Sequence, residues 1–179
     1  MRVMLLHGWG GSDFPHWQSW LAGELAKKYG CVDFVRMPNF DFPVLDEWLQ
    51  HVKNELAFFQ PDIVVCHSLA NTLWFHLCNE NFLNRKIRKL YLVAPPSLNC
   101  RIEELSSFFP VDVPETLYTQ KAFLIVSDND PYLEMEEAKL LQHRLGIDMK
   151  VLHNAGHINA ESGYGKWQWI LENIQKTEK

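Results

Sequence analysis

Cysteine is scarce in this chain, and its spacing fits neither a disulfide framework nor a metal site. The four residues are Cys31, Cys66, Cys78 and Cys100, and no two of them form a Cys-x-x-Cys pair. Small disulfide-stabilised domains carry cysteine much more densely. We therefore expect reduced, buried thiols and a cytoplasmic protein.

Long hydrophobic runs and an excess of basic residues are also absent. Only four consecutive apolar residues, 3–6, precede His7, too few for the core of a signal peptide or for a membrane span. Seventeen basic residues stand against 22 acidic ones, a formal net charge of −5. A surface that binds phosphates would need the opposite balance. We expect neither a membrane nor a nucleic acid as a partner.

What the sequence does contain is a series of short apolar runs that alternate with helical patterns. The chain has 179 residues, of which 47% are hydrophobic, so we expect one domain over residues 1–179. Apolar runs without polar alternation are typical of parallel strands buried on both faces. The expected strands are 3–6, 31–36, 63–65, 88–94, 121–127 and 148–152. This order predicts an α/β fold with a six-stranded parallel sheet, strand order 2-1-3-4-5-6 and helices on both faces.

The third apolar run changes abruptly into a helical pattern, and Ser68 lies at the junction. Apolar residues recur at helical spacing over 69–77, which leaves room for only a tight turn before them. A serine on such a turn is typical of a nucleophile elbow, whose usual signature is Gly-x-Ser-x-Gly. Here the signature is Cys66-His67-Ser68-Leu69-Ala70, and Cys66 is the departure from it. An ordinary serine in a strand-to-helix loop is the alternative.

An acid and a histidine follow later strands at the same edge of the expected sheet. Asp128 and Asp130 come after the fifth strand, and His157 comes after the sixth. The chain order Ser, Asp, His is that of α/β-hydrolases. We assign Ser68 as nucleophile, His157 as general base and acid, and Asp130 as the carboxylate that orients the histidine. Asp128 is the alternative acid.

The same reasoning predicts donors for an oxyanion and contacts for a substrate. The backbone N–H of Leu69 follows the nucleophile, and that of Trp9 lies in the loop after the first strand. We expect the irregular segment 97–110 to form a further wall of the substrate pocket. The side chains expected to contact a small-molecule acyl substrate are those of His7, Phe14, Trp17 and His67.

Two other site types are rejected. His153 and His157 are four residues apart, but the glycine between them argues against the helix that a zinc pair of this spacing would need. The glycines of residues 8–13 lack the third small residue of a dinucleotide-binding loop. We expect no metal and no cofactor.

Taken together, these segments resemble one known family, the small serine hydrolases of α/β-hydrolase fold that include YdeN-like proteins and retinoblastoma-binding protein 9. The segments that carry the resemblance are His7-Gly8-Trp9, Gly11-Ser12, Trp17-x-x-Trp20-Leu21, His67-Ser68-Leu69, Ser127-x-x-Asp130-Pro131-Tyr132 and Gly156-His157-Ile158-Asn159. The resemblance implies a minimal hydrolase without a large cap domain. It also implies the triad Ser68, Asp130 and His157. The family pattern usually has glycine where this chain has Cys66.

The leading hypothesis is a serine hydrolase of carboxylesterase type that cleaves small acyl esters or related acyl compounds through an acyl-enzyme on Ser68. A peptide or thioester substrate would use the same triad. The competing hypothesis is a non-catalytic interaction protein that retains the hydrolase fold with an impaired site, and Cys66 is the feature that favours it.

Overall fold

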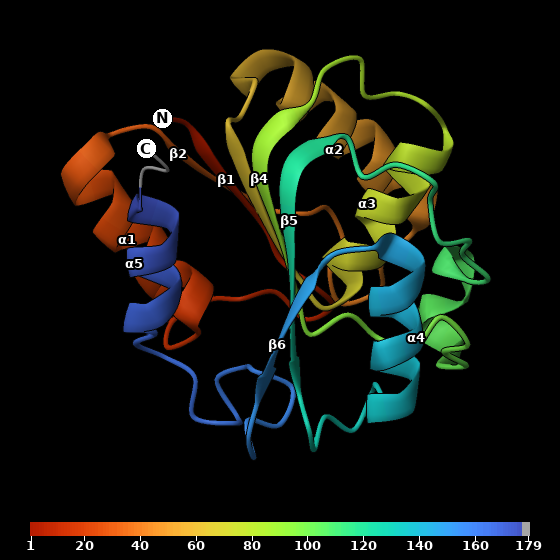
Figure 1. Cartoon of the computed structure of the whole chain (residues 1–179). Coiled ribbons are helices and arrows are strands. Elements are labelled where there is room, and N and C mark those ends of the chain that lie inside the picture. The colour runs from red at the N-terminus through yellow and green to blue at the C-terminus, as the bar shows by residue number, and fades with distance from the viewer. Residues whose placement is uncertain (177–179) are drawn as a thin grey trace.

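Six parallel strands form a single sheet in the order β2-β1-β3-β4-β5-β6 (Figure 1). The structure is a computed structural model, and it describes residues 1–176. The strands are β1 (Val3–Leu6), β2 (Val32–Val35), β3 (Ile63–His67), β4 (Ile87–Val93), β5 (Thr119–Ser127) and β6 (Asp148–Leu152). All five neighbouring pairs are parallel, which confirms the sheet and the strand order expected from the sequence. The bounds lie within two residues of those expected.

Helices cover both faces of this sheet, as the sequence predicts. The helices are α1 (Trp17–Tyr29), α2 (Leu45–Phe59), α3 (Leu69–Asn79), α4 (Met135–Leu145) and α5 (Gln168–Gln175). Helices α1 and α5 lie together on one face, and α2, α3 and α4 lie on the other (Figure 1). Segment 94–118 carries only one short 3₁₀ helix, Glu103–Phe108, and no large cap domain is inserted among residues 1–176.

The core consists of two apolar layers, one on each side of the sheet, and the strands contribute to both. In β3, Ile63 and Val65 pack in the layer beneath α1 and α5, whereas Val64 and Cys66 pack in the layer beneath α2, α3 and α4. Successive side chains of a strand point to opposite faces. A strand covered on both faces must therefore be apolar at every position, which explains the unbroken runs in the sequence.

The order of the strands reverses between β1 and β3. From β1 the chain crosses to β2 on one side, and from β2 it returns to β3 on the other side of β1. In sheets of this kind the crevice for a ligand lies beyond the carboxyl ends of the strands at this reversal. The loops after β1 and β3 meet there, because Leu6 and Cys66 are partners in the register.

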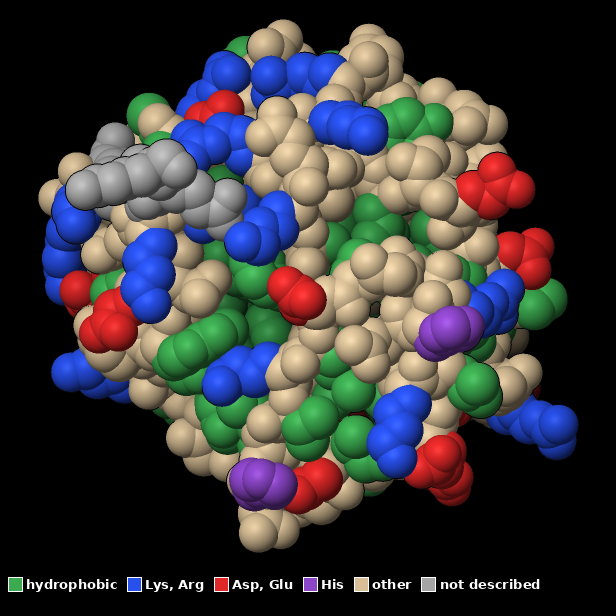
Figure 2. Space-filling model, viewed as in Figure 1, with side chains coloured by type: hydrophobic (Ala, Val, Ile, Leu, Met, Phe, Trp, Pro, Cys, Tyr) green, Lys and Arg blue, Asp and Glu red, His purple; other side chains and the backbone are tan. Residues whose placement is uncertain are grey.

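On the face seen in Figure 2, Lys and Arg side chains gather toward the end where β5 begins, away from the carboxyl ends of the strands. Hydrophobic side chains are exposed in the middle of that face. None of the helices within residues 1–176 has the length and apolar character needed to cross a bilayer.

Candidate active site

The turn between β3 and α3 holds Ser68 in a strained backbone conformation. Its φ of 54° and ψ of −125° lie in a region that residues with a side chain rarely adopt. Hydrogen bonds fix this conformation. The Ser68 N–H donates to the carbonyl of Val93 at 3.0 Å, and the Asn71 amide donates to the carbonyls of Ser68 (2.8 Å) and Val93 (2.9 Å). This conformation is typical of a nucleophile elbow.

Cys66 does not prevent the elbow from forming. Its side chain is fully buried in the apolar layer beneath α2 and α3, where it packs as a small hydrophobic group. Burial raises the pKa of the Cys66 thiol well above its usual value, so the thiol stays protonated and unreactive. The departure from glycine is accommodated in the core and does not bear on the reacting face.

The loop after β1 lies directly against the elbow, and this contact requires a glycine. A Cβ on Gly8 would come 2.6 Å from the Cβ of Ser68 and 3.1 Å from the Leu69 nitrogen. Leu69 is the first residue of α3, where N–H groups have no acceptor within the helix. The backbone of Gly8 and Trp9 therefore lies beside a free helix N-terminus.

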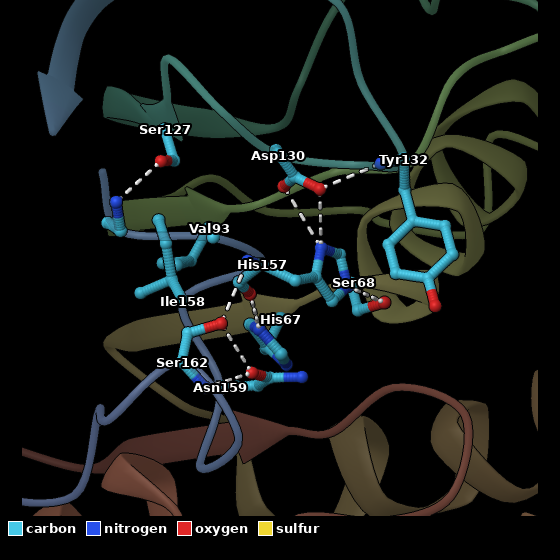
Figure 3. Close-up of polar contacts among 12 residues, drawn as sticks. His67, Ser68, Val93, Ser127, Asp130, Tyr132, His157, Ile158, Asn159 and Ser162 are labelled. Carbon is cyan, nitrogen blue, oxygen red and sulfur yellow. Dashed lines mark hydrogen bonds and ion pairs between the residues drawn. The ribbon is translucent and has the colours of Figure 1, made fainter. Parts of the chain in front are cut away.

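Ser68, His157 and Asp130 form one continuous chain of hydrogen bonds (Figure 3). The distance between Ser68 Oγ and His157 Nε2 is 2.8 Å, and His157 Nδ1 lies 3.0 Å from both carboxylate oxygens of Asp130. Because a carboxylate accepts from Nδ1–H, Nε2 is left as the acceptor for the serine hydroxyl. The Asp130 carboxylate is fully buried and also accepts from the N–H of Tyr132 at 2.9 Å.

The alternative acid, Asp128, lies in a different environment and does not contact His157. It pairs with His153, whose side chain is 85% exposed, at 2.6 Å, and it accepts from the N–H of Asn154 at 2.8 Å. The Asn154 N–H, with His153 second, lowers the pKa of Asp128. Of the two candidate carboxylates, only that of Asp130 reaches His157.

Side chains that follow β5 hold the loop that carries His157. The hydroxyl of Ser127 donates to Asn129 and accepts from the N–H of Ala155 at 2.9 Å. The amide oxygen of Asn129, which accepts from Ser127, also accepts from the N–H of Gly156 at 2.8 Å. The loops after β5 and β6 are thereby joined, and His157 is held against Asp130. The two polar residues that flank Asp128 in the sequence are the only local signal for this arrangement.

A cavity of about 460 Å³ opens beside Ser68, and both apolar and polar residues line it. The apolar lining residues include Leu69, Pro96, Cys100, Ile102 and Leu105, and the polar ones include Ser12, Asp13, His16, His67, Asn159 and Glu161. Segment 97–110 thus lines the cavity, as expected, while Trp9 and Tyr132 also border it.

Of the four side chains expected to contact a substrate, only His67 lines this cavity. The expectation is wrong for Trp17, which is fully buried in the layer beneath α1 and α5, with its indole N–H donating to the carbonyl of Ile158 at 2.7 Å. It is also wrong for Phe14, which is 87% exposed and does not border the cavity. Helical periodicity places Trp17 on a buried face, but the sequence does not distinguish core from cavity.

His7 is the third correction, because its ring faces the core side of its loop. Its Nε2 accepts from the N–H of Met37 at 3.0 Å, and its ring packs edge-on against Phe40 and Trp48. Burial lowers the pKa of His7, so the ring is neutral and acts as an acceptor. His7 therefore anchors the segment after β2 and does not contact the cavity.

Two of the cavity residues that were not expected from the sequence, His16 and Tyr132, carry aromatic rings. His16 lies immediately before α1, its ring 4.8 Å from that of His67 between centroids. Burial, with the His16 ring second, holds the pKa of His67 well below its usual range. Tyr132 packs edge-on against His157 at 4.6 Å. The sequence carried no signal for His16, because its place as the cap of α1 is seen only in the structure. Among residues 1–176, no group of three or more side chains is arranged to hold a metal ion.

Comparison with known proteins identifies the family. A family model described as serine hydrolase matches residues 3–176, nearly the whole chain. The chain belongs to this serine hydrolase family. The resemblance seen in the sequence is thereby confirmed, and the protein is a hydrolase of α/β-hydrolase fold.

Relatives and solved structures match most of the chain. YdeN of Bacillus subtilis is 23% identical over 175 residues, which cover 91% of this chain and 88% of YdeN. Its crystal structure superposes with a TM-score of 0.83, covering 97% of this chain and 96% of that one. A YdeN-like protein of Pectobacterium atrosepticum is 24% identical, with a TM-score of 0.77 and coverage of 97% and 88%. Est1E of Butyrivibrio proteoclasticus, in a structure with ferulic acid bound, is 13% identical, with a TM-score of 0.65 and coverage of 97% and 89%. At these identities the structural similarity shows a shared fold.

Proposed function

We propose that this serine hydrolase cleaves small carboxylic esters or related acyl compounds through an acyl-enzyme on Ser68. The observation that supports this most directly is the unbroken chain of hydrogen bonds from Ser68 Oγ through the His157 ring to the buried Asp130 carboxylate. The strained elbow supports it as well, because the strain presents the serine hydroxyl to the cavity.

In the first half of the reaction, Ser68 Oγ attacks the carbonyl carbon of the ester. His157 Nε2 takes the hydroxyl proton as the new C–O bond forms, and Asp130 stabilises the imidazolium. The carbonyl π electrons move onto oxygen to give a tetrahedral oxyanion. His157 then gives its proton to the leaving alkoxide oxygen, the C–O bond to the alcohol breaks, and the acyl group remains on Ser68.

In the second half, water replaces the alcohol. His157 removes a proton from a water molecule as the oxygen of that water attacks the acyl carbon. The second tetrahedral intermediate collapses, Ser68 recovers its proton from His157, and the carboxylic acid leaves. We assign the oxyanion donors to the backbone N–H groups of Leu69 and Trp9, which lie on the two segments that meet at Gly8.

The size and lining of the cavity favour a modest substrate. A volume of about 460 Å³ lies within the range of small-molecule sites. The apolar lining residues, Leu69, Pro96, Cys100, Ile102 and Leu105, suit an acyl chain or an alcohol of similar polarity. Est1E, which shares the fold, has been crystallised with ferulic acid, an aromatic carboxylic acid. We therefore propose a small organic ester as substrate, with neither a nucleic acid nor a membrane as partner.

A non-catalytic interaction protein is the alternative, and Cys66 was the feature in its favour. The thiol is buried in the core, and Ser68 keeps its elbow conformation and its contact with His157. These observations favour catalysis over an impaired site.

The test is covalent labelling with a fluorophosphonate, an electrophile that reacts readily with an activated serine. The wild-type protein is compared with Ser68→Ala, and the site of the adduct is mapped by peptide mass spectrometry. We expect a label on Ser68 in the wild type, none in the variant, and equal melting temperatures because only one hydroxyl is removed. A folded wild-type protein that takes no label, and hydrolyses none of a panel of 4-nitrophenyl esters, would support the interaction protein instead.

A further inference from the structure

Two large aromatic side chains that line the cavity beside Ser68 remain exposed. They are Trp9 and Tyr132, which are 39% and 44% exposed. Other exposed aromatic residues, such as Phe58, do not line this cavity. Covering apolar surface of this kind is favourable, because it removes that surface from water. The two residues therefore mark the part of the cavity where an apolar group of a substrate can bind.

The main chain of Tyr132 is held by hydrogen bonds on both sides. Its N–H donates to the Asp130 carboxylate at 2.9 Å, and its carbonyl accepts from the N–H of Ser97 at 2.8 Å. The Ser97 hydroxyl in turn donates to Glu137 of α4 at 2.8 Å. Because both main-chain groups of Tyr132 have partners within the protein, the part of this residue that is free to contact a ligand is its side chain.

The Tyr132 ring lies next to the base of the triad. Its centroid is 4.6 Å from that of the His157 ring, and the two planes meet at 69°. In Figure 3 the Tyr132 ring and Ser68 lie on the same side of the His157 ring. The edge-on contact with His157 covers only part of Tyr132, since 44% of the residue stays exposed. Ring surface is therefore open beside the two residues that carry out the reaction.

The geometry of the tetrahedral intermediate relates this surface to one part of the substrate. The oxyanion is directed to the N–H groups assigned to it, on Leu69 and Trp9. The leaving oxygen must come within about 2.6–3.2 Å of His157 Nε2, because it takes its proton from there. The carbon group on that oxygen therefore lies beside His157, where the Tyr132 ring is the neighbouring exposed aromatic side chain.

The surroundings of Tyr132 favour an apolar group without negative charge. Pro96 lines the cavity and directly precedes Ser97, whose N–H binds the Tyr132 carbonyl. Asp13 and Glu161 line the same cavity, whereas no Lys or Arg among residues 1–176 does, so an anionic group would meet repulsion without compensation. An aromatic group gains more here than a saturated one of similar size, because aromatic rings attract each other in offset-stacked and edge-on arrangements.

We propose that the Tyr132 ring binds the alcohol portion of the substrate and gives the enzyme a preference for esters of aromatic alcohols without negative charge. This inference rests on the proposed function and narrows its substrate class. Tyr132 determines specificity in this proposal and transfers no proton. Benzyl esters are the simplest members of the preferred class.

The test uses pairs of esters that differ only in whether a six-membered ring is aromatic. One pair is benzyl acetate and cyclohexylmethyl acetate, with the ring in the alcohol portion. The other pair is methyl phenylacetate and methyl cyclohexylacetate, with the ring in the acyl portion. The readout is the ratio of kcat/KM within each pair, compared between proteins so that differences in intrinsic reactivity cancel. A general loss of activity lowers both members of a pair and leaves the ratio unchanged.

The test variant is Tyr132→Leu, which removes the ring, and Tyr132→Phe keeps the ring without the hydroxyl. Phe58→Leu is the matched control, because Phe58 is an aromatic residue of α2 that is 88% exposed and does not line the cavity. We expect the preference for benzyl acetate to fall by roughly 2–10-fold in Tyr132→Leu, the effect of one contact between aromatic rings. Tyr132→Phe and Phe58→Leu keep the wild-type ratio, and the ratio of the acyl pair is the same in all four proteins.

An alcohol-pair ratio that is equal in the wild type and in Tyr132→Leu would overturn the proposal. A change confined to the acyl pair would overturn the assignment to the alcohol portion. Both results leave the esterase function intact. If Ser68 takes the fluorophosphonate but benzyl acetate is not hydrolysed, the preference alone is wrong. If none of the four esters is hydrolysed and Ser68 takes no label, the proposed function itself fails, and the preference with it.

Discussion

Replacement of Gly8 by alanine is the change whose effect the structure predicts most directly. The added Cβ would lie 2.6 Å from the Cβ of Ser68, whereas carbon atoms in ordinary contact are about 3.5 Å apart or more. Relief requires the loop after β1 to move away from the elbow by about 0.9 Å, the difference between these two distances. The N–H of Trp9, on the next residue, moves with it.

The size of the catalytic effect follows from the geometry of an oxyanion hole. Its donors act at about 2.7–3.1 Å from the developing oxyanion, so a shift of this size breaks the hydrogen bond from Trp9. Loss of one such donor costs about 2.7–4 kcal/mol in the transition state. We therefore expect Gly8→Ala to lower kcat by roughly 10²–10³-fold, with a much smaller change in KM.

The assay is steady-state hydrolysis of 4-nitrophenyl acetate, with circular dichroism and thermal melting to show that the variant is folded. Gly23→Ala is the matched control. Gly23 lies within α1, and a Cβ there meets no atom within 4 Å. We expect this control to keep the wild-type kcat and to be more stable by about 0.5–1 kcal/mol. A folded Gly8→Ala protein with a kcat within threefold of the wild type would refute both the close approach and the role assigned to Trp9.

Three further predictions concern the acid, the buried histidine and the thiols. Asp130→Asn should lower kcat on the order of 10⁴-fold while Asp128→Asn stays near the wild type, and the reverse result would overturn the assignment. The folded-state pKa of His16 is about 4 and the unfolded value about 6.5, so the unfolded chain binds the proton first and stability falls as the pH drops from about 6.5 toward 4. Between pH 7 and pH 5, the free energy of unfolding measured with urea should therefore fall by about 2 kcal/mol more in the wild type than in His16→Asn. Equal decreases in the two proteins would contradict this. In the native protein a thiol reagent should modify the exposed Cys31 and spare the buried Cys66, whose pKa is raised, and modification of both at similar rates would count against the buried position.

The sequence by itself determined the fold and the order of the reacting residues. Strands buried on both faces must be apolar at every position, so runs such as 3–6 and 63–65 are visible without any tertiary information. The change from that pattern to helical spacing at Ser68 leaves room for only a tight turn between strand and helix. Because the carboxyl ends of parallel strands lie at one edge, the serine, the acid and His157 were expected together before their distances were known.

Only the tertiary structure decided which side chains reach His157 and which reach the cavity. Asp128 and Asp130 are two residues apart on one loop, and hydrogen bonds from a different loop turn one toward solvent and the other toward His157. Trp17 and His16 are adjacent, yet the first packs in the core and the second lines the cavity. The direction of a side chain in a loop depends on backbone angles that contacts distant in the sequence fix. Periodicity describes strands and helices, but it carries no information about those contacts.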